Sequence, residues 1–203
     1  MPLESGYHNG TDDPFDRDSA DIRPPLWQGA GVIYPDKYKE EYAHLLPIGW
    51  PDALPGQSTA VAPGAVSVTR ADHITFDSCT FVNLETYGLD LSKGVFDCRI
   101  TYCEFAHNGA GGIKIGGGLV QSPESDRNGR HLISDNYIHD LSEIYPSAAG
   151  ILSLHSFGNL ISHNELHNIK HMGISVGWQW RYINNVSRNN IIEYNYIHNM
   201  GGS

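Results

Sequence analysis

The segment GNLISHNELHNIKHMGISVGWQW, residues 158–180, decides the fold because it contains two β patterns in succession. In its first half, Ile161 is followed three positions later by Asn164 and two positions after that by Leu166. In its second half, Gly173 opens the short run GISVG. Apolar residues that alternate with a period of two indicate half-buried strands. The segment therefore predicts short strands separated by turns.

The first pattern recurs along the chain, each time as an apolar residue, then Cys or Asn, then a second apolar residue. The copies are FDSCTFVNL from Phe76, ITYCEFAHN from Ile100, ISDNYIHDL from Ile133, ISHNELHNI from Ile161 and IEYNYIHNM from Ile192. When such copies stack, equivalent residues form ladders, and stacked amides bond to one another and to the turn backbone. The predicted inward ladder is Cys79, Cys103, Asn136, Asn164 and Asn195. The cysteines are expected to be free thiols in this ladder.

The second pattern is a short β run that follows a glycine. The runs are GAVSV from Gly64, GLDLS from Gly88, GIKIG from Gly112, GILSL from Gly150 and GISVG from Gly173. The resulting steps are 24, 24, 38 and 23 residues, and the long step contains a polar loop at residues 116–130. A period of this length without a helical pattern predicts an all-β solenoid, a right-handed parallel β-helix of about five coils over residues 64–203. Residues 1–63 lack the repeat and are expected to form an irregular N-terminal arm, with one short helix from Asp36 to Leu46.

Composition excludes several classes of protein. The 203-residue chain has 13 basic and 23 acidic side chains, for a net charge of −10, which argues against general nucleic-acid binding and against docking on anionic membranes. No apolar stretch approaches the length of a membrane-spanning helix. Three cysteines are too few for a disulfide scaffold. Localisation stays open.

The repeats resemble the right-handed parallel β-helix repeat proteins of carbohydrate metabolism, some of which are glycoside hydrolases that act on xylosides or fucosides. The stretches that carry this resemblance are YGLDLSKG (87–94), GGIKIGG (111–117), residues 158–180 and NNIIEYNYIHNMG (189–201). The resemblance implies a carbohydrate ligand and, for the family, an extracytoplasmic location. It also implies an acidic segment in the coil that would follow residue 203, so the chain is expected to be the N-terminal part of a longer protein. Whether this chain is itself an enzyme is left open.

One outward row of the predicted β-helix is the candidate substrate face. Its expected members follow the glycines of the second pattern: Ser67, Asp90, Lys114, Ser153 and Ser175. Their expected inward neighbours include Leu152 and Leu154. Asp90 is a candidate acid or base, and Lys114 a candidate ligand for a sugar hydroxyl or carboxylate. The structural alternative is a surface salt bridge between the two on adjacent coils.

The loop GWQWRY adds candidate sugar contacts beside this row. Trp178 and Trp180 can stack on sugar rings, and Arg181 can donate two hydrogen bonds to hydroxyls or carboxylates. His155, which follows its strand in the fourth coil, is a candidate catalytic residue. The structural alternatives are a tryptophan that closes the loop against the core and a histidine with a packing role.

Other polar patterns indicate structure. His163, His167 and His171 have a spacing that converges only on a helix, so no metal site is predicted, and no cofactor is implied. Histidines at 139, 167 and 198 form a column that favours turn stabilisation. Glutamates at 104 and 165 share a second outward column, with a tyrosine at 137 between them, so no complete acid pair is visible.

The leading hypothesis is a carbohydrate-active β-helix protein of glycoside hydrolase type that acts on or binds a poly- or oligosaccharide. The first alternative is a noncatalytic glycan-binding or structural solenoid. The second is a polysaccharide lyase in which Lys114 is the base. Because the fifth coil still repeats, self-association through an open C-terminal coil is also expected.

Overall fold

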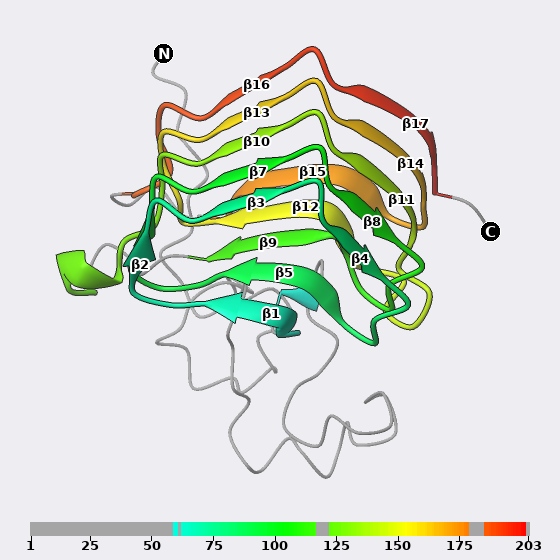
Figure 1. The fold of residues 1–203 in the computed structure, drawn as a ribbon, viewed down its shortest axis with the longest axis horizontal. Helices are drawn as coiled ribbons and strands as arrows, with labels where there is room; N and C mark the ends of the chain where they lie inside the picture. Colours follow the sequence, from blue (N-terminus) through cyan, green and yellow to red (C-terminus); the bar gives the residue numbers. More distant parts are fainter. Residues whose placement is uncertain (1–58, 61, 117–121, 179–184, 202–203) are drawn as a thin grey trace, which may run out of the picture.

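A computed structural model describes residues 59–60, 62–116, 122–178 and 185–201. The predicted helix at residues 36–46 and most of the predicted arm lie outside these ranges, so the boundary at residue 63 stays a prediction. The described chain is almost entirely β and winds through three stacked parallel sheets (Figure 1). Among the described residues, no helix is long and apolar enough to cross a membrane.

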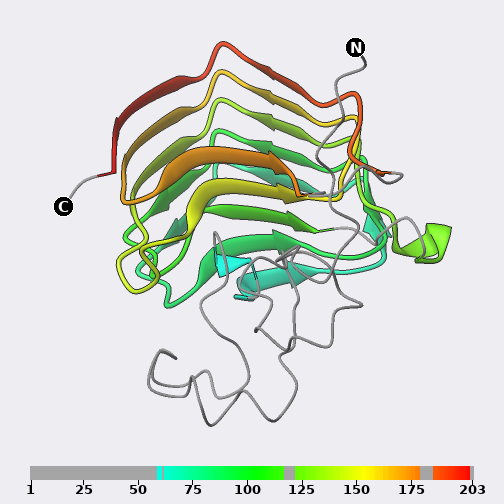
Figure 2. The ribbon, with the colours of Figure 1, turned by 180° about the vertical axis from the view of Figure 1, so that it is seen from behind.

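Sheet A runs along one side of the molecule and is seen in front in Figure 2. Its strands are β1 (Gly64–Val68), β5 (Tyr87–Leu91), β9 (Ile113–Gly116), β12 (Ala149–Leu154) and β15 (Met172–Gly177). Every residue of β5 and β12 is buried, so these two strands are covered on both faces, as is usual for parallel sheets, whereas β1 has exposed residues and β15 is mostly half-buried.

Sheets C and D lie opposite sheet A and meet at a sharp bend (Figure 1). Sheet C contains β3 (Thr75–Asp77), β7 (Arg99–Thr101), β10 (Leu132–Ser134), β13 (Leu160–Ser162) and β16 (Ile191–Glu193). Sheet D contains β4 (Thr80–Val82), β8 (Glu104–Ala106), β11 (Tyr137–Leu141), β14 (Glu165–Ile169) and β17 (Tyr196–Met200). The sequence pattern of five stacked copies is thus confirmed strand by strand.

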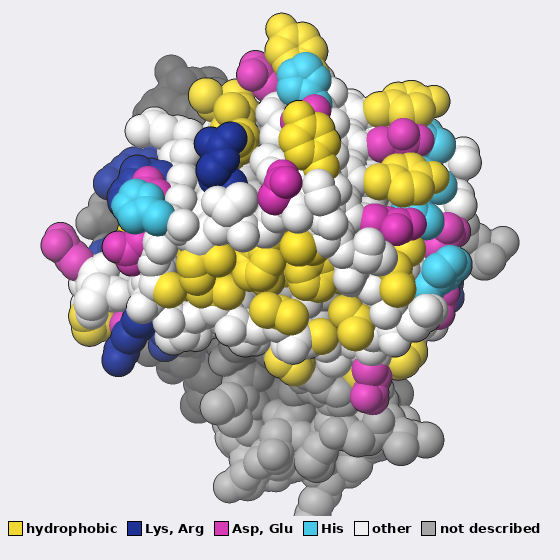
Figure 3. All heavy atoms as spheres, in the orientation of Figure 1, with side chains coloured by type: hydrophobic (Ala, Val, Ile, Leu, Met, Phe, Trp, Pro, Cys, Tyr) yellow, Lys and Arg dark blue, Asp and Glu magenta, His cyan; other side chains and the backbone are white. Residues whose placement is uncertain are grey.

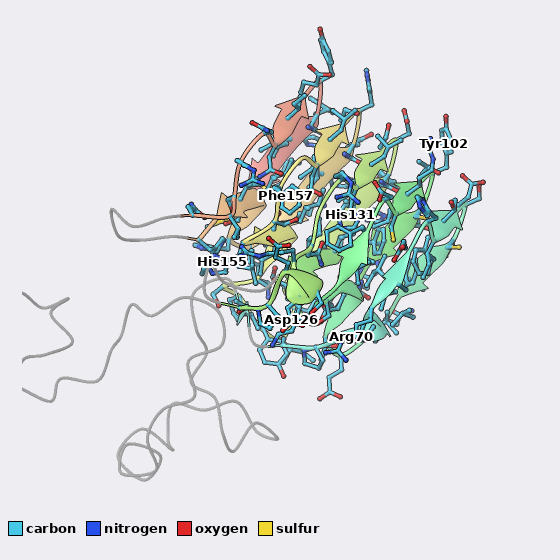
Figure 4. The ribbon with its side chains drawn as sticks, turned by 90° about the vertical axis from the view of Figure 1, so that its left-hand side faces the viewer. Arg70, Tyr102, Asp126, His131, His155 and Phe157 are labelled. Carbon is cyan, nitrogen blue, oxygen red and sulfur yellow. The ribbon has the colours of Figure 1, made fainter. Side chains whose placement is uncertain are left out.

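Two smaller elements complete the described chain. β2 (Ala71–Asp72) pairs with β6 (Val95–Phe96) in a two-stranded sheet. A short 3₁₀ helix, Glu124–Asp126, lies within the polar loop that the long repeat step predicted. The Asp126 carboxylate in this helix forms ion pairs with residues of two lower coils, at 3.7 Å from Oδ1 to the Arg70 guanidinium and 3.8 Å from Oδ2 to Lys93 Nζ. Figure 4 labels Asp126 and Arg70.

The core lies between the three sheets and is made of apolar columns. Isoleucines of sheet A, at 113 and 151, pack with those of sheet C, at 100, 133 and 161, and with Phe105 of sheet D, all of them fully buried. The rings of Phe81 and Phe105 stack with centroids 4.7 Å apart. Because each rung repeats the same apolar positions, the core is continuous along the axis.

The predicted amide ladder forms at the bend between sheets C and D. Asn164 Oδ1 accepts from the backbone N–H of Asn136 at 3.1 Å, and Asn195 Oδ1 accepts from the backbone N–H of Asn164 at 3.0 Å. The amide nitrogen of Asn164 donates to the carbonyl of Ile133 at 3.0 Å. Cys103 continues the ladder: its thiol is free, and its backbone N–H donates to Asn136 Oδ1 at 3.0 Å. The ladder explains how this tight turn buries its polar groups.

A second ladder, which the sequence reasoning missed, lies before sheet C. The N–H of Cys98 donates to His131 Nδ1 at 3.2 Å, that of His131 to Asn159 Oδ1 at 3.0 Å, and that of Asn159 to Asn190 Oδ1 at 3.1 Å. Each member stands five positions before a member of the first ladder. The recurring Asn-x4-Asn spacing at 159–164 and 190–195 was the available signal.

Candidate functional site

The outer row of sheet A differs from the predicted row in one coil. The register aligns Ser67, Asp90, Lys114, Leu152 and Ser175 across neighbouring strands. Ser153 pairs instead with Ile115 and Val176 and is buried, so the predicted placement of Ser153 in this row is wrong. The predicted inward placements of Leu152 and Leu154 are wrong for the same reason, since both pack in a buried cluster on the outer side of the sheet. Counting from Gly150, which stands in register with Gly112 and Gly173, puts Leu152 outward.

Asp90 and Lys114 are in contact, as adjacent rungs of one column allow. The Lys114 Nζ lies 3.0 Å from Asp90 Oδ2, and it also donates to the carbonyl of Ala62. Each of the two residues is only 7% exposed, so the pair is a buried ion pair and not the surface salt bridge of the structural alternative. The Lys114 Nζ lies 5.9 Å from the centre of the Tyr87 ring. A buried pair of this kind depends on its hydrogen bonds to offset desolvation.

The Asp90 carboxyl group has one bonded and one unbonded oxygen. Its Oδ1 is buried and has no hydrogen-bond partner within the described part of the chain. Burial raises the pKa of Asp90 above the ordinary aspartate value, and the nearby Lys114 ammonium opposes only part of this shift. A carboxyl group that retains its proton more readily is suited to donate it to a leaving group. Asp90 is therefore a buried carboxyl group with a raised pKa that is paired with an ammonium group through one oxygen.

The outer face of sheet A is covered by two chain segments. Ala60 and Ala62 come from the segment before β1, and Tyr145 and Ala148 come from the segment before β12, and all pack in one buried cluster with Leu152. The Thr59 and Ser147 hydroxyls lie 2.9 Å apart and join the two segments. The Asp90–Lys114 pair thus lies beneath a cover.

Two of the remaining predicted site residues, Trp178 and His155, follow the neighbouring strands β15 and β12 of sheet A. Trp178 is buried in the same cluster and donates from Nε1 to the Ser175 hydroxyl at 3.1 Å, which matches the structural alternative for this tryptophan. His155 is buried, and burial lowers its pKa (Figure 4). Its backbone N–H bonds to the Gly177 carbonyl at 3.2 Å. Trp180 and Arg181 lie outside the described residues.

The outer face of sheet D carries a second polar surface, and this one is exposed. Glu104, Tyr137, Glu165 and Tyr196 form one column, which we call the Tyr–Glu column. Histidines at 139, 167 and 198 form the neighbouring column, with ring centroids 5.1 Å and 4.9 Å apart. Figure 3 shows hydrophobic and acidic side chains alternating up this side of the molecule, with histidines beside them. Sequence reasoning identified both columns, but not that together they form an open surface.

Within the described ranges, no three His, Cys, Asp or Glu side chains are placed to hold a metal ion. The three cysteines are all free. Burial raises the pKa of both Cys98 and Cys103, which makes these thiols less reactive as nucleophiles. The two faces described above are therefore the candidate sites.

Comparison with known proteins supports the predicted resemblance. The family model described as "Right handed beta helix region" matches residues 64–203. A solved structure named "Glycoside hydrolase" is similar at 28% sequence identity and a TM-score of 0.65, over 68% of this chain and 25% of that one. The chain thus spans about a quarter of the length of that structure. No curated protein matches the chain. These findings support a protein of the carbohydrate-active type.

Proposed function

The chain belongs to the right-handed β-helix family, and from this premise we propose that it is a glycoside hydrolase-type protein that binds a poly- or oligosaccharide at the outer face of sheet A. The observation that carries the proposal is the state of Asp90. Its carboxyl group is buried, has a raised pKa and, among the described residues, keeps one oxygen without a hydrogen-bond partner beside the Lys114 ammonium. Such a group can protonate a glycosidic oxygen.

The roles of the neighbouring residues follow from their contacts. Lys114 orients Asp90 through Oδ2, which leaves Oδ1 to face the leaving-group oxygen. When a sugar replaces the Ala62 carbonyl, the same ammonium can donate to a sugar hydroxyl. The Ser175 hydroxyl, which accepts from Trp178, offers a further contact at the end of the row. Substrate entry on this scheme requires Ala60 and Ala62 to move aside, and the bound sugar then takes over the burial of the Asp90 carboxyl group.

Hydrolysis of a glycosidic bond ordinarily needs a second carboxyl group as base or nucleophile. The described row contains one carboxylate, Asp90, because its other members are Ser67, Lys114, Leu152 and Ser175. The proposal therefore assigns the second carboxyl group to a residue outside this row.

The test is an activity screen of the full chain on aryl glycosides and neutral polysaccharides, with binding measured in parallel. We expect Asp90→Asn to lose at least about a hundredfold in turnover while it still binds the substrate. Asp97→Asn, an identical change at a surface turn, is the matched control and should retain turnover. Absence of both hydrolysis and binding in the wild-type chain would falsify the proposal.

Asp90→Asn also removes the partner of a buried lysine, so folding needs its own control. The double variant Asp90→Asn/Lys114→Met removes both charges and avoids an unpaired buried ammonium. If this variant is folded by circular dichroism and equally inactive, misfolding caused by an unpaired buried ammonium is excluded as the reason for the lost turnover. If it regains turnover, Asp90 is not the acid.

A noncatalytic glycan-binding solenoid is the second candidate function. The observation that favours it is the cover over the Asp90–Lys114 pair together with the single carboxylate in the row. Glycan binding without turnover, unchanged in Asp90→Asn, would support this candidate over the first. A lyase is less favoured, because the Lys114 Nζ already donates to two oxygens.

A further inference from the structure

The Tyr–Glu column on sheet D is an exposed row of aromatic rings and carboxylates on a regular strand surface. Tyr137 is 41% exposed and Tyr196 is 63% exposed. The Glu104 and Glu165 side chains are 44% and 45% exposed. Because this face is open, it contrasts with the covered row of sheet A. Nothing in the hydrolytic scheme above uses it.

The tyrosine rings are held in place by the histidine column. The Tyr137 ring lies 4.1 Å from that of His139, and the Tyr196 ring lies 4.4 Å from that of His198, at interplanar angles of 40° and 32°. The Tyr137 hydroxyl also lies 3.0 Å from His167 Nε2. Rings that are already fixed lose little conformational entropy when a ligand stacks on them.

The spacing of the column suits a chain of sugar rings that runs along the helix axis. Neighbouring rungs are about 4.8 Å apart, so Tyr137 and Tyr196, two rungs apart, are separated by about 9.6 Å. Glu165 lies on the rung between them. An extended polysaccharide can therefore place alternate rings against the two tyrosines and present the hydroxyls of the ring between them to the carboxylate.

The charge of the face selects the kind of polysaccharide. Glu104 and Asp140 both lie beside His139, and Glu165 lies beside His198. Nearby, Glu143 contacts His107, and Lys170 donates to the Glu143 carbonyl at 3.5 Å. Carboxylates outnumber lysines on this face, so its charge is negative and repels uronates. The carboxylate oxygens can accept hydrogen bonds from the hydroxyls of a neutral sugar.

We propose that the Tyr–Glu column of sheet D is a binding surface for a neutral, extended polysaccharide, separate from the row that contains Asp90. The inference rests on the proposed function for its ligand class, and it adds a second site that holds the polymer on a different face. Its residues are positioned for binding, and no bond is broken there.

The experiment measures binding of the full chain to cellohexaose and xylohexaose, with oligogalacturonate of the same length as the anionic probe. We expect Tyr137→Ala and Tyr196→Ala each to weaken binding of a neutral hexaose by about tenfold. Tyr137→Phe keeps the ring and should bind within about twofold of wild type. Tyr102→Ala is the matched control, since Tyr102 is 66% exposed but lies outside the column.

The outcomes separate this inference from the hydrolytic proposal. Tyrosine-dependent binding in a chain without turnover supports the column and overturns the hydrolytic proposal. Turnover that depends on Asp90, with binding unchanged in folded Tyr137→Ala and Tyr196→Ala, overturns the column alone. Preference for oligogalacturonate over both neutral hexaoses also overturns it.

Discussion

His131 is a buried histidine whose hydrogen bonds require the neutral ring. It is 1% exposed, its Nδ1 accepts from the backbone N–H of Cys98, and its Nε2 lies 2.5 Å from Asn128 Oδ1 (Figure 4). The neutral tautomer with hydrogen on Nε2 satisfies both contacts. A second proton on Nδ1 would face the Cys98 N–H and break this rung of the second ladder.

The cost of protonation follows from the pKa of this ring. Burial lowers the pKa of His131 from the ordinary 6.5 to about 4. Between these values the unfolded chain binds a proton that the folded chain does not, so the free energy of unfolding falls as the pH decreases. The contribution of the neutral His131 ring to the free energy of unfolding is complete above the pKa of the unfolded chain, 6.5, and is lost as the pH falls to about 4. The full loss is about 3 kcal/mol, at 1.36 kcal/mol for each pKa unit.

The assay is urea unfolding of wild type and His131→Asn at pH 7 and at about pH 4.5. The asparagine supplies an acceptor for the Cys98 N–H, as in the neighbouring rungs, but it does not titrate. We expect the stability of wild type relative to this variant to fall by about 2–3 kcal/mol between the two pH values. His131→Ala loses the hydrogen bonds at both pH values and separates their effect from titration. The reasoning is refuted if the wild-type and His131→Asn curves change in parallel.

Four further perturbations test other parts of the molecule. Gly111→Ala should destabilise the fold by about 3 kcal/mol in urea unfolding, since the new Cβ would lie 2.0 Å from the Ala149 carbonyl oxygen; an unchanged midpoint would contradict this contact. Asn164→Ala should cost about 2–4 kcal/mol, because the Asn136 N–H and the Ile133 carbonyl of the rung below lose their bonds to this side chain, whereas a loss below about 1 kcal/mol would show that the ladder is dispensable. Asp97→Asn should cost less than about 1 kcal/mol, because the Asp97–Arg130 pair is half exposed, and the cost should vanish at acid pH, where the lowered pKa of Asp97 no longer keeps it charged. Ile197 is 41% exposed on the fifth rung, at a position that is buried in the rungs below, and we propose that it supports self-association. Ile197→Lys should therefore abolish any concentration-dependent association in sedimentation velocity. Association that persists in this variant would place the contact elsewhere.

Much of the fold was predictable because a β-helix repeats a local pattern. Ile161, Asn164 and Leu166 occupy fixed positions within a coil, and the same spacing in every copy determines which residues stack. Ser153 departs from the predicted row because the run after Gly150 reverses the usual order, with apolar Leu152 at the outward position and polar Ser153 at the inward one. Polarity therefore predicts the wrong face in this coil, whereas the register from Gly150 predicts the right one. The second ladder was missed because a histidine and a cysteine replace asparagine in it.

The sequence by itself determined the repeat, the inward ladder of Asn136, Asn164 and Asn195, and the columns of residues that stack on neighbouring rungs. These follow from the short-range periodicity of a strand and from the constant rise between rungs. Only the tertiary structure decided which outer face is covered. The segments that carry Ala62 and Tyr145 pack over Asp90 and Lys114 from distant parts of the chain, and no repeat encodes that contact. Burial of Asp90, and with it the raised pKa of this residue, therefore depends on tertiary packing, whereas the stacking of the Tyr–Glu column of sheet D follows from the repeat.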